Sequence, residues 1–185
     1  MKQSEKRTKW QIIGDWLYYG FLSLCIGIFL VNLFVVRLAV VSGRSMMPTL
    51  EDRELLVVWQ LGYEPEAGDI VVIDTSTEFF HREYIVKRVI ALEGQTVTID
   101  YDLNTVCVDG TVLEEPYIQY NEIDPMLSPD WQPVVQYTVP EGCVFVLGDN
   151  RNHSSDSRNS RYGMIPAEDL LGKVTKVLPF KLPER

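Results

Sequence analysis

Leu17–Val36 reads LYYGFLSLCIGIFLVNLFVV, a run of twenty residues without a charge. An α-helix of this length rises about 30 Å, which is enough to cross the hydrocarbon core of a bilayer. A cleavable signal peptide is the competing interpretation, but its apolar region usually has only about 7–15 residues and is followed by an A-x-A site. No such site follows here. The run therefore predicts a transmembrane signal-anchor helix over residues 17–36.

Basic residues before this run predict its orientation. They are Lys2, Lys6, Arg7 and Lys9. Because basic flanks stay on the cytoplasmic side of a spanning helix, we expect residues 1–16 to be a basic cytoplasmic N-terminus. Residues 37–185 are then extracytoplasmic and begin at the outer surface of the membrane.

The charge of the remaining chain excludes one class of partner. Residues 38–185 contain twelve Lys/Arg against twenty-four Asp/Glu, and the net charge of the whole chain is -9. Nucleic-acid binding needs a basic patch or stripe, which this acidic segment lacks. We therefore expect no DNA or RNA partner.

The three cysteines are Cys25, Cys107 and Cys143. Their spacing contains no C-x-x-C motif and histidines are few, so a zinc or redox site has little support. Cys107 and Cys143 each lie in a strand-like stretch, where two free thiols or a disulfide are both open interpretations. We expect no metal and no other cofactor.

After the anchor, the sequence consists of short strand-like segments separated by turn residues. The expected strands cover residues 54–61, 69–74, 84–92, 96–100, 105–108, 143–147 and 173–178. Asp109-Gly110 lies at the centre of Asn104–Glu114 and predicts a β-hairpin. No stretch keeps a helical period over ten residues. The pattern predicts one mainly β, antiparallel domain.

Ser42–Leu50, SGRSMMPTL, is the first of three clusters that could carry chemistry. Gly, Ser and Pro are turn formers, so a plain turn is one interpretation. Met46 and Met47 argue for more, because methionines exposed on a loop are costly unless they line a groove or touch lipid.

Lys87 interrupts the apolar segment Tyr84–Leu92 together with Arg88. Neighbouring residues of a strand point to opposite faces, so one of the two cations is expected in an apolar setting. Desolvation lowers the pKa of a lysine and leaves a neutral amine that can act as a base. The alternative is a lysine that lies along the sheet surface with its amine in water.

Histidine is the other possible base, and the chain has only His81 and His153. His153 lies in the third cluster, Gly148–Arg158, among aspartates and serines, which leaves a Ser/His/Asp arrangement open. Adjacent residues rarely converge on one point, however. The charged residues of this cluster could also simply pair with one another.

Four segments resemble the sequence boxes of the bacterial type I signal peptidases. Ser42–Leu50, with its G-x-S-M-x-P-T core, is similar to the nucleophile box, and Gly68–Val72 to the short box that follows. Tyr84–Val89 resembles the lysine box and Gly148–Arg158 the G-D-N-R-x-x-S-x-D-S-R box. All four occur in the family's order, after an N-terminal anchor.

The resemblance implies a role for each matching residue. Ser45 is the expected nucleophile, Lys87 the general base, and Ser154 the serine that orients the lysine. Four charged residues are expected to brace the site: Asp149, Arg88, Asp156 and Arg158.

The oxyanion hole is only partly implied. The backbone N–H of Ser45 is one expected donor. Some members place a serine two residues before the nucleophile as the second donor, but this chain has Gly43 there. The second donor is open, and Ser42 could serve only if the turn differs.

The family likeness also implies coiled antiparallel sheets and a small β-lobe, expected within residues 104–139. The implied substrates are signal peptides of secreted preproteins, cut after small residues at positions -1 and -3. Candidate pocket residues are Val41, Met46, Leu50 and Ile85. The expected location is the bacterial cell membrane, and a monomer is the default assembly.

Two other functions compete. A self-cleaving regulator similar to SOS-response repressors shares this catalytic core but lacks the leading apolar span. A tethered β-domain that only binds partners would have an inert Ser45.

Overall fold

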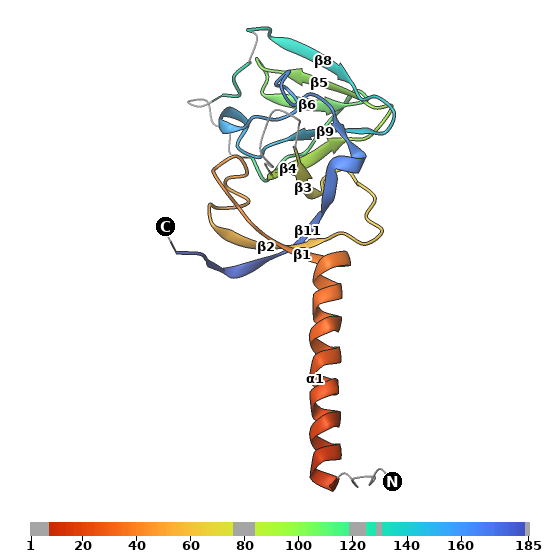
Figure 1. Cartoon of the computed structure of the whole chain (residues 1–185). Coiled ribbons are helices and arrows are strands. Elements are labelled where there is room, and N and C mark those ends of the chain that lie inside the picture. Colours follow the sequence, from red (N-terminus) through yellow and green to blue (C-terminus); the bar gives the residue numbers. More distant parts are fainter. Residues whose placement is uncertain (1–7, 76–83, 119–124, 129–130, 184–185) are drawn as a thin grey trace.

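The computed structural model describes residues 8–75, 84–118, 125–128 and 131–183. It begins with one long helix, α1 (Lys9–Phe34), and continues into a β-rich domain (Figure 1). Within the described part, this helix is the one candidate that is long and apolar enough to cross a membrane. The expected combination of an N-terminal apolar helix and a β-domain is confirmed.

The helix begins before the uncharged run because its first turn is capped. The Thr8 hydroxyl accepts a hydrogen bond from the backbone of Gln11 at 3.4 Å, and the Gln11 side chain accepts one from the backbone of Thr8 at 2.9 Å. This reciprocal capping box satisfies two backbone N–H groups that the helix itself cannot pair. α1 therefore starts at Lys9 rather than at Leu17.

The helix also ends earlier than its composition predicts. Its last residue is Phe34, and Val36 opens the first strand instead of closing the helix. Valine is β-branched and suits an extended backbone, and Val36 pairs with Trp59 of the next strand. The domain thus starts within two residues of the helix end.

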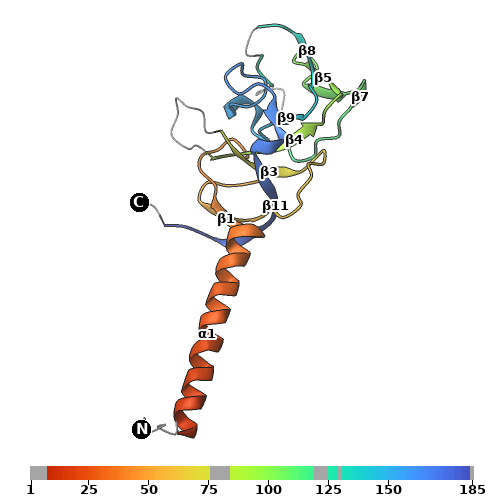
Figure 2. The ribbon, with the colours of Figure 1, turned by 45° about the vertical axis from the view of Figure 1, so that its right-hand side comes forward.

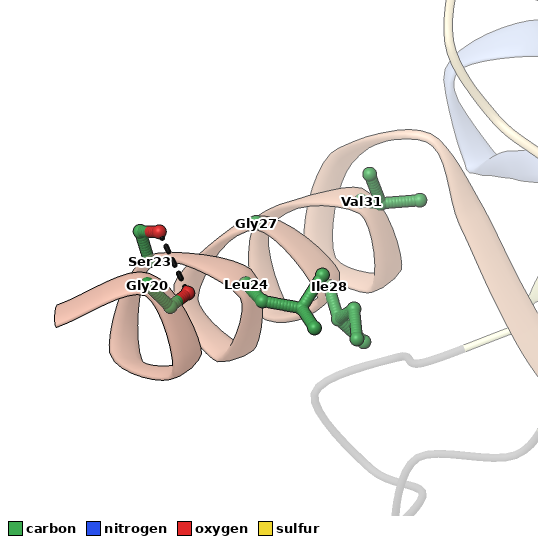
Figure 3. A pocket seen from close by; sticks show the side chains of 6 residues that line it. All are labelled: Gly20, Ser23, Leu24, Gly27, Ile28 and Val31. Atoms are coloured by element: carbon green, nitrogen blue, oxygen red, sulfur yellow. Dashed lines mark hydrogen bonds between the residues drawn. The ribbon is translucent and has the colours of Figure 1, made fainter. Parts of the chain in front are cut away.

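Small residues leave a groove of about 610 Å³ along one face of α1 (Figure 3). It is lined by Gly20, Ser23, Leu24, Gly27, Ile28 and Val31. The Ser23 hydroxyl donates to the Gly20 carbonyl at 2.9 Å, which satisfies this polar group within the helix itself.

Two antiparallel sheets form the domain. The larger has the order β1-β2-β11-β3-β4-β9-β10, and the smaller has the order β7-β6-β5-β8. The larger sheet contains β1 (Val36–Val40), β2 (Glu54–Trp59), β3 (Ile70–Asp74), β4 (Tyr84–Ala91), β9 (Cys143–Leu147), β10 (Ile165–Pro166) and β11 (Leu170–Lys181). The smaller contains β5 (Thr96–Asp100), β6 (Thr105–Val108), β7 (Thr111–Val112) and β8 (Val134–Thr138). The expected mainly β, antiparallel fold is confirmed.

Several boundaries differ from those expected. The hairpin around Asp109-Gly110 is present as β6 and β7, with Val108 opposite Thr111. The smaller sheet also includes β5, so the lobe begins at Thr96 rather than within 104–139. The sequence pattern did not predict β1, β8 and β10. β1 continues an apolar run without a turn residue, and the other two lack a strong alternation.

The two sheets lie at different distances from the helix. β1, β2 and β11 are next to the end of α1, and the smaller sheet is at the far end of the domain (Figures 1 and 2). β4 and β9 lie between them, and β4 continues into β5 of the smaller sheet. Cys107 and Cys143 are both half-buried free thiols. This agrees with the free-thiol interpretation.

Candidate active site

Ser45 and Lys87 are in direct contact. The Lys87 Nζ donates a hydrogen bond to Ser45 Oγ at 2.9 Å, and it also contacts the Val86 carbonyl at 2.9 Å. Only 3% of the Lys87 surface is exposed. A hydroxyl within hydrogen-bond reach of a buried amine is the geometry that an activated nucleophile requires.

Strand geometry explains why Lys87 and Arg88, which are neighbours in β4, contact different partners. In β4, Lys87 lies opposite Val71 of β3, and Arg88 lies opposite Ile70. Successive side chains of a strand point to opposite faces, so the lysine reaches Ser45 and the arginine reaches Asp149. Lys87 and Arg88 are both buried, whereas the sequence pattern predicted an apolar setting for only one of them.

Ser45 itself lies in the turn between β1 and β2. Asn150 holds this turn from the other side: its backbone N–H donates to the Ser45 carbonyl at 3.0 Å, and its side chain donates to the Arg44 carbonyl at 3.1 Å. The sequence reasoning missed Asn150 as a site residue. Its only signal is its place within the G-D-N-R segment.

The turn leaves one backbone donor beside the nucleophile. Among the described contacts, the N–H of Ser45 donates no hydrogen bond. The N–H of Gly43 is already used, because it donates to Asp52 Oδ1 at 2.8 Å. Gly43 has a φ of +91°, a left-handed backbone that suits glycine, and Ser42 is exposed.

Gly148 allows two parts of the site to approach each other. A Cβ at this position would lie 2.2 Å from Ser154 Oγ and 2.5 Å from the Ser45 carbonyl oxygen. The Ser154 hydroxyl is buried and has no hydrogen-bond partner in the part of the chain described here. The structure therefore brings Ser154 close to the nucleophile turn without a hydrogen bond to Lys87.

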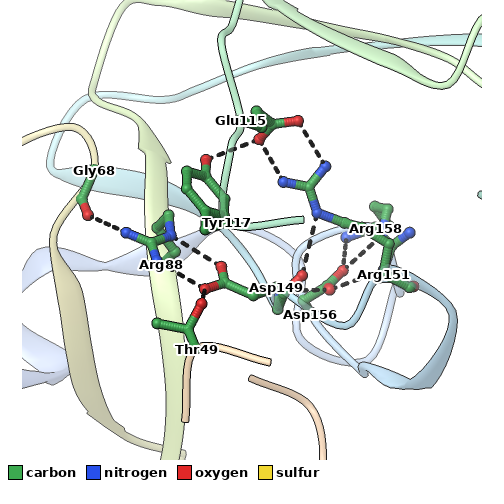
Figure 4. A network of polar contacts seen from close by, with 10 residues as sticks. Thr49, Gly68, Arg88, Glu115, Tyr117, Asp149, Arg151, Asp156 and Arg158 are labelled. Atoms are coloured by element: carbon green, nitrogen blue, oxygen red, sulfur yellow. Dashed lines mark hydrogen bonds and ion pairs between the residues drawn. The ribbon is translucent and has the colours of Figure 1, made fainter. Parts of the chain in front are cut away.

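Arg88 and Asp149 form a two-pronged ion pair (Figure 4). Arg88 Nε donates to Oδ1 at 2.9 Å, and Nη2 donates to Oδ2 at 2.7 Å. Thr49 Oγ1 also donates to Oδ2, at 2.5 Å, and Arg88 Nη1 donates to the Gly68 carbonyl at 2.8 Å. Asp149 therefore connects β4 to the turn that carries Ser45. Thr49 was not expected as a site residue.

Asp156 and Arg158 form a second buried pair. Arg158 Nε and Nη2 donate to the carboxylate at 2.8 and 2.9 Å, and the N–H of Gly148 donates to Asp156 Oδ2 at 3.0 Å. Burial acts to lower the pKa of Arg158, but its hydrogen bonds to Asp156 outweigh this and raise the pKa. Arg158 therefore stays protonated, and Asp156 fixes the backbone at Gly148.

A polar pocket of about 230 Å³ lies behind this pair. Its lining residues are Leu127, Ser128, Arg151, Asn152, Ser154, Asp156, Arg158 and Asn159. Ser154 thus lies between the nucleophile turn and this polar pocket.

The four expected pocket residues belong to two hydrophobic clusters. Val41, Met46 and Leu50 are at most 4% exposed and pack together in the core beneath β2. Ile85 packs in a different cluster, with residues such as Val89 and Val146. The Met46 side chain is part of this core, and the assignment of these four residues to the substrate pocket stays a prediction. Met47 is the exposed methionine of the pair.

His153, the one histidine in the described part of the chain, takes no part in this arrangement. His153 is exposed on a short 3-10 helix, Arg151–His153. His81 lies outside the described residues. Among the described contacts, the group that donates to Ser45 Oγ is the amine of Lys87.

A helix long and apolar enough to span a membrane, a β-rich domain and a serine hydrogen-bonded to a buried lysine fit the class of membrane-attached serine hydrolases. The family model described as "Signal peptidase, peptidase S26" matches residues 13–178. The chain belongs to this family.

Two relatives agree with the family assignment by sequence. The chain is 38% identical to Signal peptidase I of Bacillus caldolyticus, over 97% of this chain and 96% of the relative. It is 34% identical to Probable signal peptidase I-1 of a Synechocystis species, over 93% of this chain and 85% of the relative. A crystal structure of a signal peptidase I from Enterococcus faecalis is 28% identical and has a TM-score of 0.49, covering 61% of this chain and 98% of that one.

Proposed function

We propose that this protein is a membrane-bound serine endopeptidase that removes N-terminal signal peptides from exported preproteins, cutting after small residues at -1 and -3. The observation that carries the proposal is the 2.9 Å contact between Lys87 Nζ and Ser45 Oγ in a chain of the signal peptidase family. The family supplies the substrate class, and the contact supplies the chemistry.

Burial makes Lys87 suitable as the general base. An amine removed from water favours its neutral form, and a neutral amine accepts the proton of a hydroxyl within hydrogen-bond distance. Ser45 Oγ then attacks the scissile carbonyl and forms a tetrahedral intermediate. When the C–N bond breaks, the lysine ammonium returns its proton to the leaving amine.

A second half-reaction restores the enzyme. Lys87 takes a proton from water, the resulting hydroxide attacks the acyl-enzyme ester, and the proton returns to Ser45 Oγ as the ester bond breaks. This sequence needs only the serine, the lysine and water. It therefore requires no metal or nucleotide.

The N–H of Ser45 is the proposed first donor to the oxyanion. It lies in the turn that carries the nucleophile and donates no hydrogen bond among the described contacts. Gly43 has no side chain and its N–H is bonded to Asp52, so the second donor comes from another group. Candidate donors are Ser42 and a bound water.

Ser154 is the proposed orienting residue for Lys87. An unpaired buried hydroxyl costs free energy, so the Ser154 hydroxyl has a driving force to gain a partner when substrate completes the site. Arg88, Asp149, Asp156 and Arg158 brace the segments that carry the nucleophile and the base.

The proposed location is the bacterial cell membrane, with residues 1–16 in the cytoplasm and the β-domain outside. The outer face of β1 and β2 supports contact with the membrane surface, because Leu38, Val40 and Trp59 are between 42% and 53% exposed there. These strands lie at the end of α1 (Figure 1). Confinement of enzyme and preprotein to one surface raises their effective concentration, and one copy of the chain suffices.

The test is cleavage of a preprotein in detergent by the wild type and by Ser45→Ala. The proposal expects the wild type to release a mature product whose N-terminus follows the -1 residue, and Ser45→Ala to release none. Equal cleavage by both proteins would exclude Ser45 as the nucleophile. Cleavage of the chain itself, with the preprotein intact, would favour the self-cleaving regulator.

A further inference from the structure

Tyr117 covers the flat face of the Arg88 guanidinium, although it lies on the connection after β7 and outside all four family boxes. Its ring centroid is 3.9 Å from Arg88 Cζ (Figure 4). A cation within about 6 Å of a ring face is attracted to it, most strongly where water is excluded. Asp149 therefore accepts hydrogen bonds from the edge of the Arg88 guanidinium, and the Tyr117 ring stacks on its face.

Other buried groups fix Tyr117 in turn. Its hydroxyl donates to Glu115 Oε1 at 2.9 Å, and the same carboxylate accepts hydrogen bonds from Arg151 at 2.5 and 3.2 Å. The Arg151 side chain is fully buried. Burial raises the pKa of Tyr117 and the charge of Glu115 raises it further, so the hydroxyl stays a donor.

This chain of contacts leads back to the nucleophile. Arg151 Nε donates to the carbonyl of Gly148 at 3.1 Å, and Gly148 lies against the Ser45 carbonyl. Arg88, at the other end, is the residue after Lys87. Tyr117 and Glu115 thus connect the base-bearing strand β4 to the turn beside Ser45, by a route separate from Asp149.

We propose that Tyr117, held by Glu115, is a positioning residue for the Ser45/Lys87 pair. Its ring keeps water away from the Arg88–Asp149 ion pair. It also fixes β4 in the position in which Lys87 reaches Ser45. A displacement of a reacting group by about 1 Å can cost on the order of a hundredfold in rate. The inference rests on the proposed peptidase function.

The experiment compares two substitutions at the same position. Tyr117→Phe keeps the ring over Arg88, and Tyr117→Leu removes it. Glu115 is less suitable, because its loss would leave the buried Arg151 cation without this carboxylate. The matched control is Tyr162→Leu, since Tyr162 faces Arg161 at 5.6 Å in a tyrosine–arginine pair outside this network.

We expect Tyr117→Leu to lower kcat for preprotein cleavage by about tenfold, with KM within about twofold of the wild type. Tyr117→Phe should keep kcat within about threefold, and Tyr162→Leu should match the wild type. Rates are normalised to the folded fraction from circular dichroism. Tyr117→Met provides a second ringless variant if the leucine variant unfolds.

Three results would overturn the inference while leaving the peptidase function intact. They are a wild-type kcat in the ringless variants, an equal loss in Tyr117→Phe and Tyr117→Leu, and a rise in KM at unchanged kcat. A wild-type protein that cleaves no preprotein would overturn the inference together with the function on which it rests.

Discussion

The Arg88 guanidinium and the Asp149 carboxylate meet through two hydrogen bonds of 2.9 and 2.7 Å, one residue along β4 from the lysine that contacts Ser45. Arg88 and Asp149 are not part of the Ser45/Lys87 pair, yet their ion pair fixes β4 against the turn that carries Ser45. The stability of this ion pair and the activity of the site are therefore expected to change together.

Asp149→Ala should reduce both the free energy of unfolding and the cleavage activity. Removal of one partner of a buried ion pair costs about 3–5 kcal/mol, because the other charge is left unpaired. Urea unfolding in detergent, followed by fluorescence, measures this loss. Lys181→Ala, which removes the exposed pair with Glu51, is the control and should cost less than about 1 kcal/mol. Equal effects of the two substitutions would contradict a bracing role.

Gly148→Ala should abolish most activity. The added methyl group would lie 2.2 Å from Ser154 Oγ and 2.5 Å from the Ser45 carbonyl, so the turn or Ser154 must move. We expect a loss of about a hundredfold in kcat/KM, measured by gel-based preprotein cleavage. Gly27→Ala is the matched control, because a Cβ there meets no atom within 4 Å. Wild-type activity in Gly148→Ala would show that the close approach is not needed.

Ser154→Ala should separate activity from stability. The hydroxyl is buried and unpaired among the described contacts, so its removal should leave the melting temperature unchanged or raise it. If Ser154 orients Lys87 during turnover, kcat should still fall by about 10–100-fold. A lower melting temperature with unchanged kcat would assign Ser154 a structural role instead.

Tyr101 should make the fold sensitive to alkaline pH. Burial raises its pKa to about 12. A raised folded-state pKa contributes stability that is present below the unfolded value of 10.0 and is lost as the pH rises through about 12. Tyr101→Phe lacks this group, so the stability difference should be constant up to about pH 10 and then move in favour of the variant. Urea unfolding across this range measures the difference, and parallel curves above pH 10 would contradict it.

The parts of the fold that depend on local pattern could be predicted from the sequence. The apolar run gave the helix, Asp109-Gly110 gave the hairpin, and the alternation of β4 separated Lys87 from Arg88. The helix start was missed because a capping box extends it to Lys9. β1 was missed because its residues continue the apolar run.

The resemblance named Ser45, Lys87, Arg88 and Asp149, but several other tertiary contacts of the site were not predicted. Asn150 and Thr49 lie within two of the family boxes, but their contacts form only when distant segments fold together. Tyr117 lies outside the boxes, and no spacing in the sequence indicates its contact with Arg88. The burial of Met46 also depends on tertiary packing. Its neighbours in sequence are polar turn residues, yet its side chain lies in the core.

The most direct test of the central claim is the cleavage rate of Lys87→Met, which keeps the length of the apolar side chain but removes the amine. Lys176→Met is the matched control, because Lys176 is an exposed lysine on β11. Both are measured against the wild type with the same preprotein in detergent, across a range of pH. We predict wild-type cleavage by Lys176→Met and none by Lys87→Met at any pH. Cleavage at the correct site by Lys87→Met, at a rate near that of the wild type, would contradict Lys87 as the base for Ser45.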